Sequence, residues 1–111
     1  LDLYPTIASL CRLDVPERLQ GKDVSAMLDE PTATVRETVF CVNGRGFLLR
    51  NKDWAYIQYA EDASKGIELF NMNKDPLQYQ NLAGRAKYAD LVQRFKDELK
   101  QKLAEVRDND L

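Results

Sequence analysis

Side chains that could act as nucleophiles are present, but none has a partner that would activate it. The three serines, Ser9, Ser25 and Ser64, are not surrounded by a Gly-x-Ser-x-Gly segment. The chain also contains no histidine, the side chain that most often serves as general base or metal ligand. Because a serine hydroxyl needs an adjacent base to attack a substrate, the sequence predicts no catalytic residue in this chain.

The two cysteines, Cys11 and Cys41, are too few for a disulfide framework, and neither has a neighbouring base. Each lies in an apolar run, so we expect both to be buried thiols. Sequence spacing does not decide whether two cysteines can pair, and the pairing of Cys11 with Cys41 stays open.

Clustered carboxylates at 61–64 and 108–111 lack the regular oxygen-ligand spacing and the closing glutamate of a calcium loop. We therefore expect solvated turn and tail charges there, and no metal site. The segment "NGRG" at 43–46 has two glycines, but no helix follows that could present its N-terminus to a phosphate. It is better interpreted as a hairpin turn, whose Arg45 could contact an anionic ligand held by a neighbouring domain.

The composition is that of one globular domain. The chain has 111 residues, of which 44% are hydrophobic and 31% charged. A net charge of −2 gives no electrostatic case for nucleic acid, and no apolar run reaches the roughly 20 residues of a membrane span. Five aromatic residues alternate along the expected strands as core residues do, without the basic residues of a nucleic-acid platform: Phe47, Trp54, Tyr56, Tyr59 and Phe70.

Hydrophobic periodicity predicts two short helices in the first third of the chain. Residues 2–12 place Leu3, Ile7 and Leu10 on one stripe, with Asp2 as N-cap and a proline in the first turn. A loop follows, and a second helix is expected at 23–29.

From residue 37 the hydrophobic period changes to two. Strands are expected at 37–43, 46–51, 53–60 and 67–72, joined in hairpin order. A last helix at 87–106 carries a continuous apolar stripe and two supportive charge pairs, Asp90–Arg94 and Glu98–Lys102. The predicted fold class is α+β: a four-stranded antiparallel sheet with this C-terminal helix packed on one face, plus the short N-terminal helices.

The stretch "ELFNMNKDPLQYQNLAG" at 68–84 resembles a signature near the C-terminus of sulfatases, members of the alkaline-phosphatase-like superfamily. Gln78 stands where the family usually has glutamate. The first 28 residues are similar to the family's Asp-Leu-x-Pro-Thr helix and the connection after it, except that Cys11-Arg12 replaces the usual Ala-Gly. The matching positions are Asp2, Pro5, Thr6, Pro16, Gly21, Leu28, Leu69, Phe70, Asn71, Asp75, Pro76, Asn81, Leu82 and Ala83.

This resemblance implies that the chain is a fragment of a sulfate-ester hydrolase. Residues 1–33 would end the parent's large α/β domain and its connection, and 34–111 would form the C-terminal subdomain. The partners would be the parent's N-terminal catalytic domain and a sulfated small molecule or glycan. Formylglycine and calcium would belong to that catalytic domain, and no cofactor residue can be carried over to this segment. By resemblance the parent would be periplasmic, secreted or lysosomal; the segment itself does not indicate a compartment.

The hairpin tips offer the one candidate contact with substrate. Arg45 and Lys52 could wall one side of the parent's pocket and meet an anionic substrate, while the segment alone would be inactive. Two alternatives stay open: a free-standing interaction module, or the tail of a related phosphodiesterase or phosphonate hydrolase. The corner at Asp75-Pro76 and Asn81 is expected to be structural, with the asparagine bonding local backbone at the entry to the last helix.

Overall fold

The computed structural model describes residues 1–108 and shows two compact units. One unit is Leu1–Arg36, together with the described residues that follow Glu105; the other is Glu37–Glu105. The second unit holds the sheet and most of the long helix, so the predicted α+β class is confirmed. The expected division of the parent at residues 33 and 34 stays a prediction. Of the tail cluster expected at 108–111, residues 109–111 lie outside the described residues.

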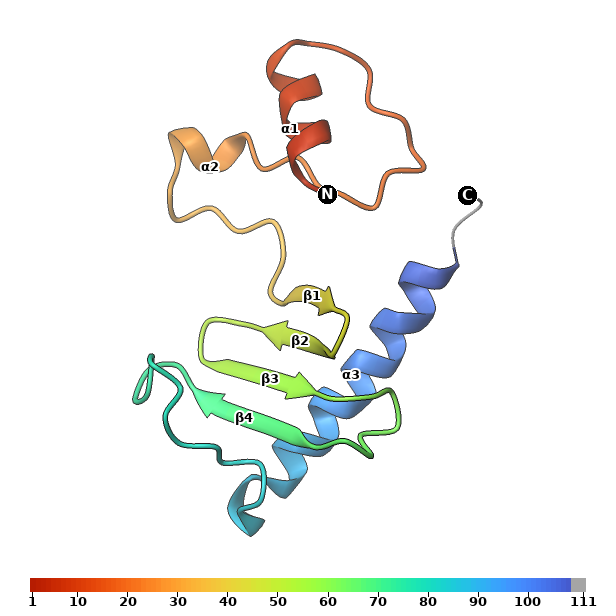
Figure 1. Ribbon diagram of the computed structural model, residues 1–111. Coiled ribbons are helices and arrows are strands. Elements are labelled where there is room, and N and C mark those ends of the chain that lie inside the picture. Colours follow the sequence, from red (N-terminus) through yellow and green to blue (C-terminus); the bar gives the residue numbers. More distant parts are fainter. Residues whose placement is uncertain (109–111) are drawn as a thin grey trace. The chain divides into compact units, whose positions relative to one another are not determined.

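The second unit is built on an antiparallel sheet in which every strand pairs with its neighbour in sequence, in the order β1-β2-β3-β4 (Figure 1). All four expected strands are confirmed, each shorter by one to three residues than the pattern indicated. The strands are β1 (Val39–Asn43), β2 (Gly46–Arg50), β3 (Trp54–Gln58) and β4 (Ile67–Asn71).

Two short turns of the sheet each begin with an asparagine that binds its own backbone. Asn43 Oδ1 accepts hydrogen bonds of 3.0 Å from the N–H groups of Arg45 and Gly46. Asn51 Oδ1 accepts in the same way from the next turn, at 3.0 Å from Asp53 N and 2.8 Å from Trp54 N. Such asparagine turns hold the hairpin ends in one conformation.

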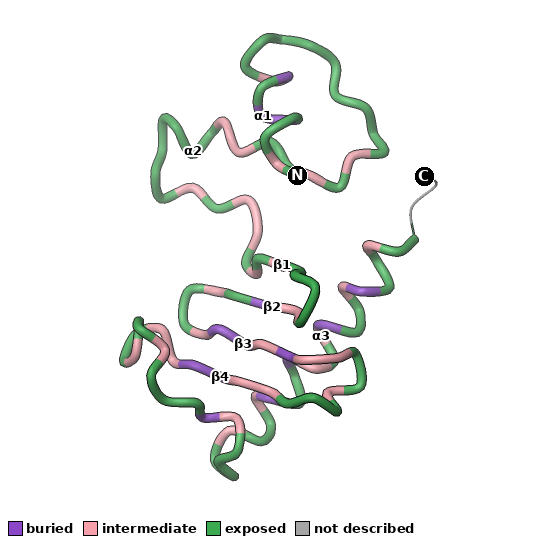
Figure 2. Tube along the Cα trace, viewed as in Figure 1, coloured by how far each residue is buried: buried purple, intermediate pink, exposed green. Residues whose placement is uncertain are grey.

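The long helix α3 (Ala89–Arg107) covers one face of the sheet and is preceded by the 3₁₀ turn η1 (Ala86–Tyr88). Buried residues gather where α3 meets β2, β3 and β4 (Figure 2). At the centre, the rings of Tyr56 and Phe95 stack with centroids 5.3 Å apart and 6° between their planes. The core members are Leu49, Tyr56, Leu69, Leu82, Val92, Phe95, Leu99 and Leu103.

The buried Tyr56 hydroxyl is paired inside the core. It donates to Gln58 Oε1 at 2.6 Å, and the Gln58 amide in turn donates to the backbone oxygens of Ala60 and Glu61. Burial raises the pKa of Tyr56 to about 12, so its hydroxyl stays protonated at neutral pH. The polar atoms that β3 brings into the core are thereby satisfied.

Two details of the last helix differ from prediction. The α-helix begins at Ala89 rather than at 87, because Ala86–Tyr88 wind as a tighter turn. Lys102 forms its ion pair with Glu105, at 2.8 Å, and not with the expected Glu98. Within residues 1–108, the expected pair of Asp90 and Arg94 forms no ion pair. Exposed helix pairs are worth only a few tenths of a kcal/mol, so this difference changes little in stability.

The first unit contains α1 (Leu3–Leu10) and α2 (Ala26–Asp29), both shorter than the expected 2–12 and 23–29. Asp2 occupies the N-cap position, but its side chain makes no capping bond. Asp2 Oδ1 instead accepts from Lys22 N at 2.9 Å and from the Arg36 guanidinium at 2.6 Å. The Lys22 bond, with Arg36 adding to it, lowers the pKa of Asp2.

Both cysteines are free and exposed, so the expectation of buried thiols is wrong. Cys11 follows the last residue of α1 as its C-cap, beyond the part of the helix that contributes buried residues. Cys41 lies in β1, an outer strand that pairs only with β2. Apolar neighbours in sequence do not bury a side chain at a helix end or a sheet edge.

Candidate functional site

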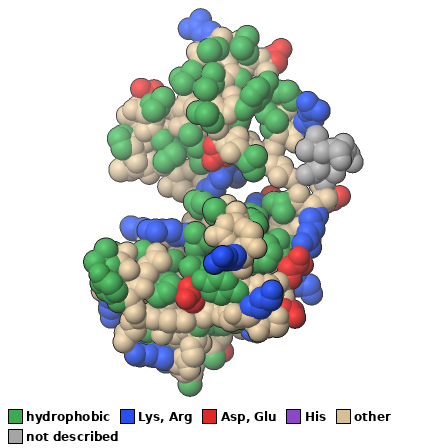
Figure 3. Space-filling view, in the orientation of Figure 1, with side chains coloured by type: hydrophobic (Ala, Val, Ile, Leu, Met, Phe, Trp, Pro, Cys, Tyr) green, Lys and Arg blue, Asp and Glu red, His purple; other side chains and the backbone are tan. Residues whose placement is uncertain are grey.

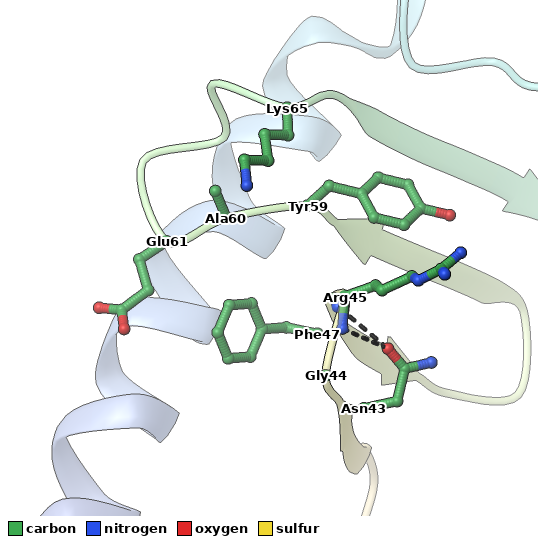
Figure 4. Close-up of a pocket in the computed structure, with 9 residues that line it drawn as sticks. Asn43, Gly44, Arg45, Phe47, Tyr59, Ala60, Glu61 and Lys65 are labelled. Carbon is green, nitrogen blue, oxygen red and sulfur yellow. Dashed lines mark hydrogen bonds between the residues drawn. The ribbon is translucent and has the colours of Figure 1, made fainter.

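A hollow of about 530 Å³ lies at the edge of the sheet where two turns meet (Figure 4). In an antiparallel meander the β1–β2 turn and the β3–β4 turn fall at the same end of the strands. The hollow is lined by both turns, through Asn43, Gly44, Arg45, Gly46, Phe47, Tyr59, Ala60, Glu61 and Lys65. We call it the turn groove.

The Tyr59 ring lies against the start of β2, and a glycine makes this close contact possible. A Cβ at Gly46 would come within 3.1 Å of Tyr59 Cδ1 and 3.2 Å of the Gln58 carbonyl oxygen. Gly66, which closes the β3–β4 turn, has a φ of +113°, a conformation that L side chains rarely adopt. Gly46 therefore permits the close approach of the Tyr59 ring, and Gly66 permits the backbone conformation that closes the β3–β4 turn.

The Tyr59 hydroxyl donates a hydrogen bond to Glu68 Oε2 at 3.1 Å. Partial burial raises the pKa of Tyr59, and the bond to Glu68 and its negative charge raise it further. The phenol is therefore protonated at neutral pH and cannot act there as a base. Its role in the groove is that of a rigid aromatic wall.

Two cations and one carboxylate line the turn groove: Arg45, Lys65 and Glu61. Figure 4 shows the Arg45 side chain running beside the Tyr59 ring, whereas Lys65 extends toward Ala60 in this view. The Arg45 backbone N–H is held by Asn43, while its guanidinium forms no ion pair within residues 1–108. The arginine side chain is thus anchored at its base and available at its tip.

The structure places the two predicted wall residues at opposite ends of β2. Arg45 directly precedes the strand and lines the turn groove, whereas Lys52 follows it in the β2–β3 turn. Both are exposed. Lys65, which shares the groove with Arg45, was not singled out from the sequence. The hairpin order could have indicated it, since alternate turns of a meander share one edge.

A second, smaller hollow of about 250 Å³ opens between the other end of the sheet and α3. Its charged side chains are Asp53, Arg94 and Glu98, so the lining carries both positive and negative charge. The remaining lining residues are Asn51, Trp54, Leu91 and Phe95.

Residues 1–108 bring together no group of three or more Asp, Glu, Cys or His side chains that could hold a metal ion. Among the same residues, no helix is long and apolar enough to cross a membrane. The serines considered as nucleophiles have no histidine anywhere in the chain to activate them.

The corner between β4 and α3 is held by two side chains of the 68–84 motif. The Asp75 carboxylate accepts from Tyr79 N at 3.0 Å and Gln80 N at 2.8 Å. Asn81 Oδ1 accepts from Leu69 N at 3.0 Å and Ala83 N at 2.9 Å. The expected structural role is confirmed, and the asparagine also reaches across to the strand.

Comparison with known proteins places this corner and sheet in a family. Residues 1–106 match the family described as "N-sulphoglucosamine sulphohydrolase, C-terminal". The chain belongs to this family of sulfatase C-terminal domains. It is 30% identical over 106 residues to Arylsulfatase K of Gallus gallus, covering 84% of this chain and 19% of that protein. It is 25% identical over 117 residues to the ulvan-active sulfatase of Formosa agariphila, covering 96% of this chain and 22% of that protein.

Solved structures agree with this assignment. A 2-O GAG sulfatase superposes with a TM-score of 0.81 at 26% identity, over 97% of this chain and 25% of that one. The phosphonate monoester hydrolase of Agrobacterium radiobacter superposes with a TM-score of 0.72 at 22% identity, over 94% of this chain and 24% of that one. This similarity shows a shared fold. The chain spans about a fifth of the length of the curated relatives it matches. The resemblance to sulfatases is confirmed, and a free-standing module is not favoured.

Proposed function

We propose that this chain is the C-terminal part of a hydrolase that acts on sulfate esters of saccharides. The observation that carries the proposal is the family match over residues 1–106. The names of the similar proteins add a substrate class, since they include a 2-O GAG sulfatase and an ulvan-active sulfatase. Both names refer to sulfatases of sulfated polysaccharides.

The chemical step would belong to a catalytic domain that precedes this chain in the parent. The family resemblance implies that formylglycine and calcium would supply the nucleophile and the charge stabilisation there. The residues present here do not fit either group. Neither cysteine and none of the serines is followed by x-Pro-x-Arg, and no histidine is available. The contribution of this chain is therefore to hold the C-terminal sheet and its turns against that domain.

The exposed stripe of α1 supports the pairing with a catalytic domain. Leu3, Ile7 and Leu10 are 73%, 50% and 59% exposed, although they follow the spacing of one helix face. Figure 3 shows hydrophobic side chains gathered on the part of the view that Figure 1 labels α1. Contiguous exposed apolar residues mark contact surfaces, and the catalytic domain is the partner that we propose for this one.

Arg45 and Lys52 remain our candidates for the substrate-pocket wall. Because they lie at opposite ends of β2, one of the two turns at most would border a compact pocket. Arg45 is the stronger candidate, since it lines a hollow that also contains Lys65.

The proposal is tested with the full-length parent and with residues 1–111 as a separate protein. Both are assayed with a generic aryl sulfate and with glucosamine 6-sulfate, each against a heat-inactivated control. We expect turnover by the parent and none by the 111-residue chain. Turnover by the chain would overturn the division of roles. A parent that cleaves phosphonate monoesters but no sulfate ester would move the protein to the phosphonate hydrolase alternative.

A further inference from the structure

We infer that the turn groove binds an anionic saccharide, with the sugar ring on Tyr59 and its sulfate or carboxylate group on Arg45 and Lys65. The ligand class rests on the proposed function, but the site belongs to this chain and requires no catalytic group. The inference adds Lys65 and Tyr59 to the predicted Arg45 contact and excludes Lys52 from the site.

The size and rigidity of the groove suit a small polar ligand. Its volume of about 530 Å³ falls within the usual range of small-molecule sites, roughly 300–1,000 Å³. One wall is the β1–β2 turn, which Asn43 holds through two backbone hydrogen bonds, and the other is the connection 59–66 between β3 and β4. Tyr59 N donates to the Gly66 carbonyl oxygen at 2.9 Å and closes the other. A preformed site loses little conformational entropy when a ligand binds.

The charges of the groove favour an anion at the side of Arg45. The guanidinium can donate two parallel hydrogen bonds to sulfate or carboxylate oxygens, and it forms no ion pair within residues 1–108. Negative groups lie nearby as well: Glu61 lines the groove, and Glu68 accepts the Tyr59 hydroxyl. Because the Tyr59 hydroxyl is engaged by Glu68, the part of Tyr59 that can contact a ligand in the groove is its ring.

Lys65 supplies the second positive charge from the opposite turn. Its neighbour Asp62 accepts hydrogen bonds from Ser64 and has a lowered pKa, to which the positive charge of Lys65 contributes least. Lys65 forms no ion pair within residues 1–108, so its ammonium group can turn toward an anion in the groove. Its flexible ammonium acts as a point charge, whereas the planar arginine selects geometry. We therefore expect Arg45 to contribute more to affinity than Lys65.

The inference is tested by titrating the ¹⁵N-labelled 111-residue chain with glucosamine 6-sulfate at low ionic strength. We expect saturable chemical-shift changes centred on Arg45, Gly46 and Lys65. Arg45→Ala should weaken binding at least about tenfold, as for loss of a charge-assisted hydrogen-bond pair. Lys65→Ala should weaken it less. The matched control is Lys74→Ala, at an exposed lysine that follows β4 at the end of the sheet opposite the groove; this variant should leave the dissociation constant unchanged.

Two further ligands separate a saccharide site from general attraction of anions. Unsulfated glucosamine should bind much more weakly than its 6-sulfate, and inorganic sulfate should bind more weakly than the sulfated sugar. Equal affinity for inorganic sulfate and the sulfated sugar, or a loss of affinity in Lys74→Ala equal to that in Arg45→Ala, would overturn the inference. An unchanged spectrum of unbound Arg45→Ala verifies that the hairpin is intact. Binding is measured without the catalytic domain. A chain that binds no saccharide would therefore leave the hydrolase proposal standing, and a parent without sulfatase activity would leave the binding inference standing.

Discussion

Replacing Phe95 by alanine should remove the central contact between α3 and the sheet. Phe95 is 3% exposed, and its ring stacks on Tyr56, which is itself fully buried. Truncating a buried phenylalanine costs about 3–5 kcal/mol, of which the aromatic stacking itself accounts for about 0.5–1.5 kcal/mol. Because the two rings are nearly parallel at 5.3 Å, the cavity would open against the flat face of Tyr56.

The size of the second unit determines what fraction of its free energy of unfolding this loss represents. A unit of Glu37–Glu105 is expected to have a free energy of unfolding of about 4–10 kcal/mol. Phe95→Ala would remove about 30% of this free energy or more, and the melting temperature should fall by about 12 °C or more. Thermal and urea unfolding followed by circular dichroism measure both quantities.

The matched control is Leu77→Ala, at a residue that is 70% exposed in the turn region after β4. This variant should stay within about 0.5 kcal/mol of the unchanged chain. If Phe95→Ala and Leu77→Ala melted within a degree or two of each other, the packing of α3 on the sheet through Phe95 would be refuted.

Two other predictions concern the motif corner and the first unit. Asn81→Ala should lower the free energy of unfolding by about 1–3 kcal/mol, because the backbone of Leu69 and Ala83 loses its side-chain acceptor; an unchanged urea midpoint would contradict this. The Asp2 carboxylate has a lowered pKa in the folded chain, so its stabilisation is complete above its usual pKa of 3.8 and is lost as the pH falls through the folded value. The Lys22 amide resonance should therefore titrate with a midpoint below 3.8, and a midpoint at or above that value would show that the Asp2 bond does not form in solution.

The sheet could be predicted from the sequence because its signals are local. Alternation along 53–60 places Tyr56 and Gln58 on the face that α3 covers, and the asparagine turns at Asn43 and Asn51 mark where the strands reverse. Strand order then follows from short connections, since neighbouring strands joined by tight turns pair with each other. The edge that holds the turn groove is a direct consequence of this order.

The parts that could not be predicted depend on contacts distant in sequence in one case and on local backbone conformation in another. Asp2 reads as an N-cap, but its carboxylate is taken by Lys22 N and Arg36, twenty and thirty-four residues away. The end of α1 differs for a local reason: Arg12 adopts the left-handed φ of 57° that favours glycine, and its N–H bonds to the Ser9 carbonyl oxygen. The substitution of Cys11-Arg12 for Ala-Gly signals an altered helix end but not its conformation.

The corner that follows β4 has a consequence for self-association. β4 is an outer strand of the sheet, and outer strands offer unpaired backbone groups to strands of other chains. Here the Leu69 N–H binds the Asn81 side chain, the Leu69 carbonyl accepts from Leu82 N at 2.8 Å, and the Ile67 carbonyl accepts from the Asn81 amide. An incoming strand therefore finds the middle of this edge already occupied. Asn81 and Leu82 therefore protect the β4 edge from pairing with another chain, in addition to leading the chain into its last helix.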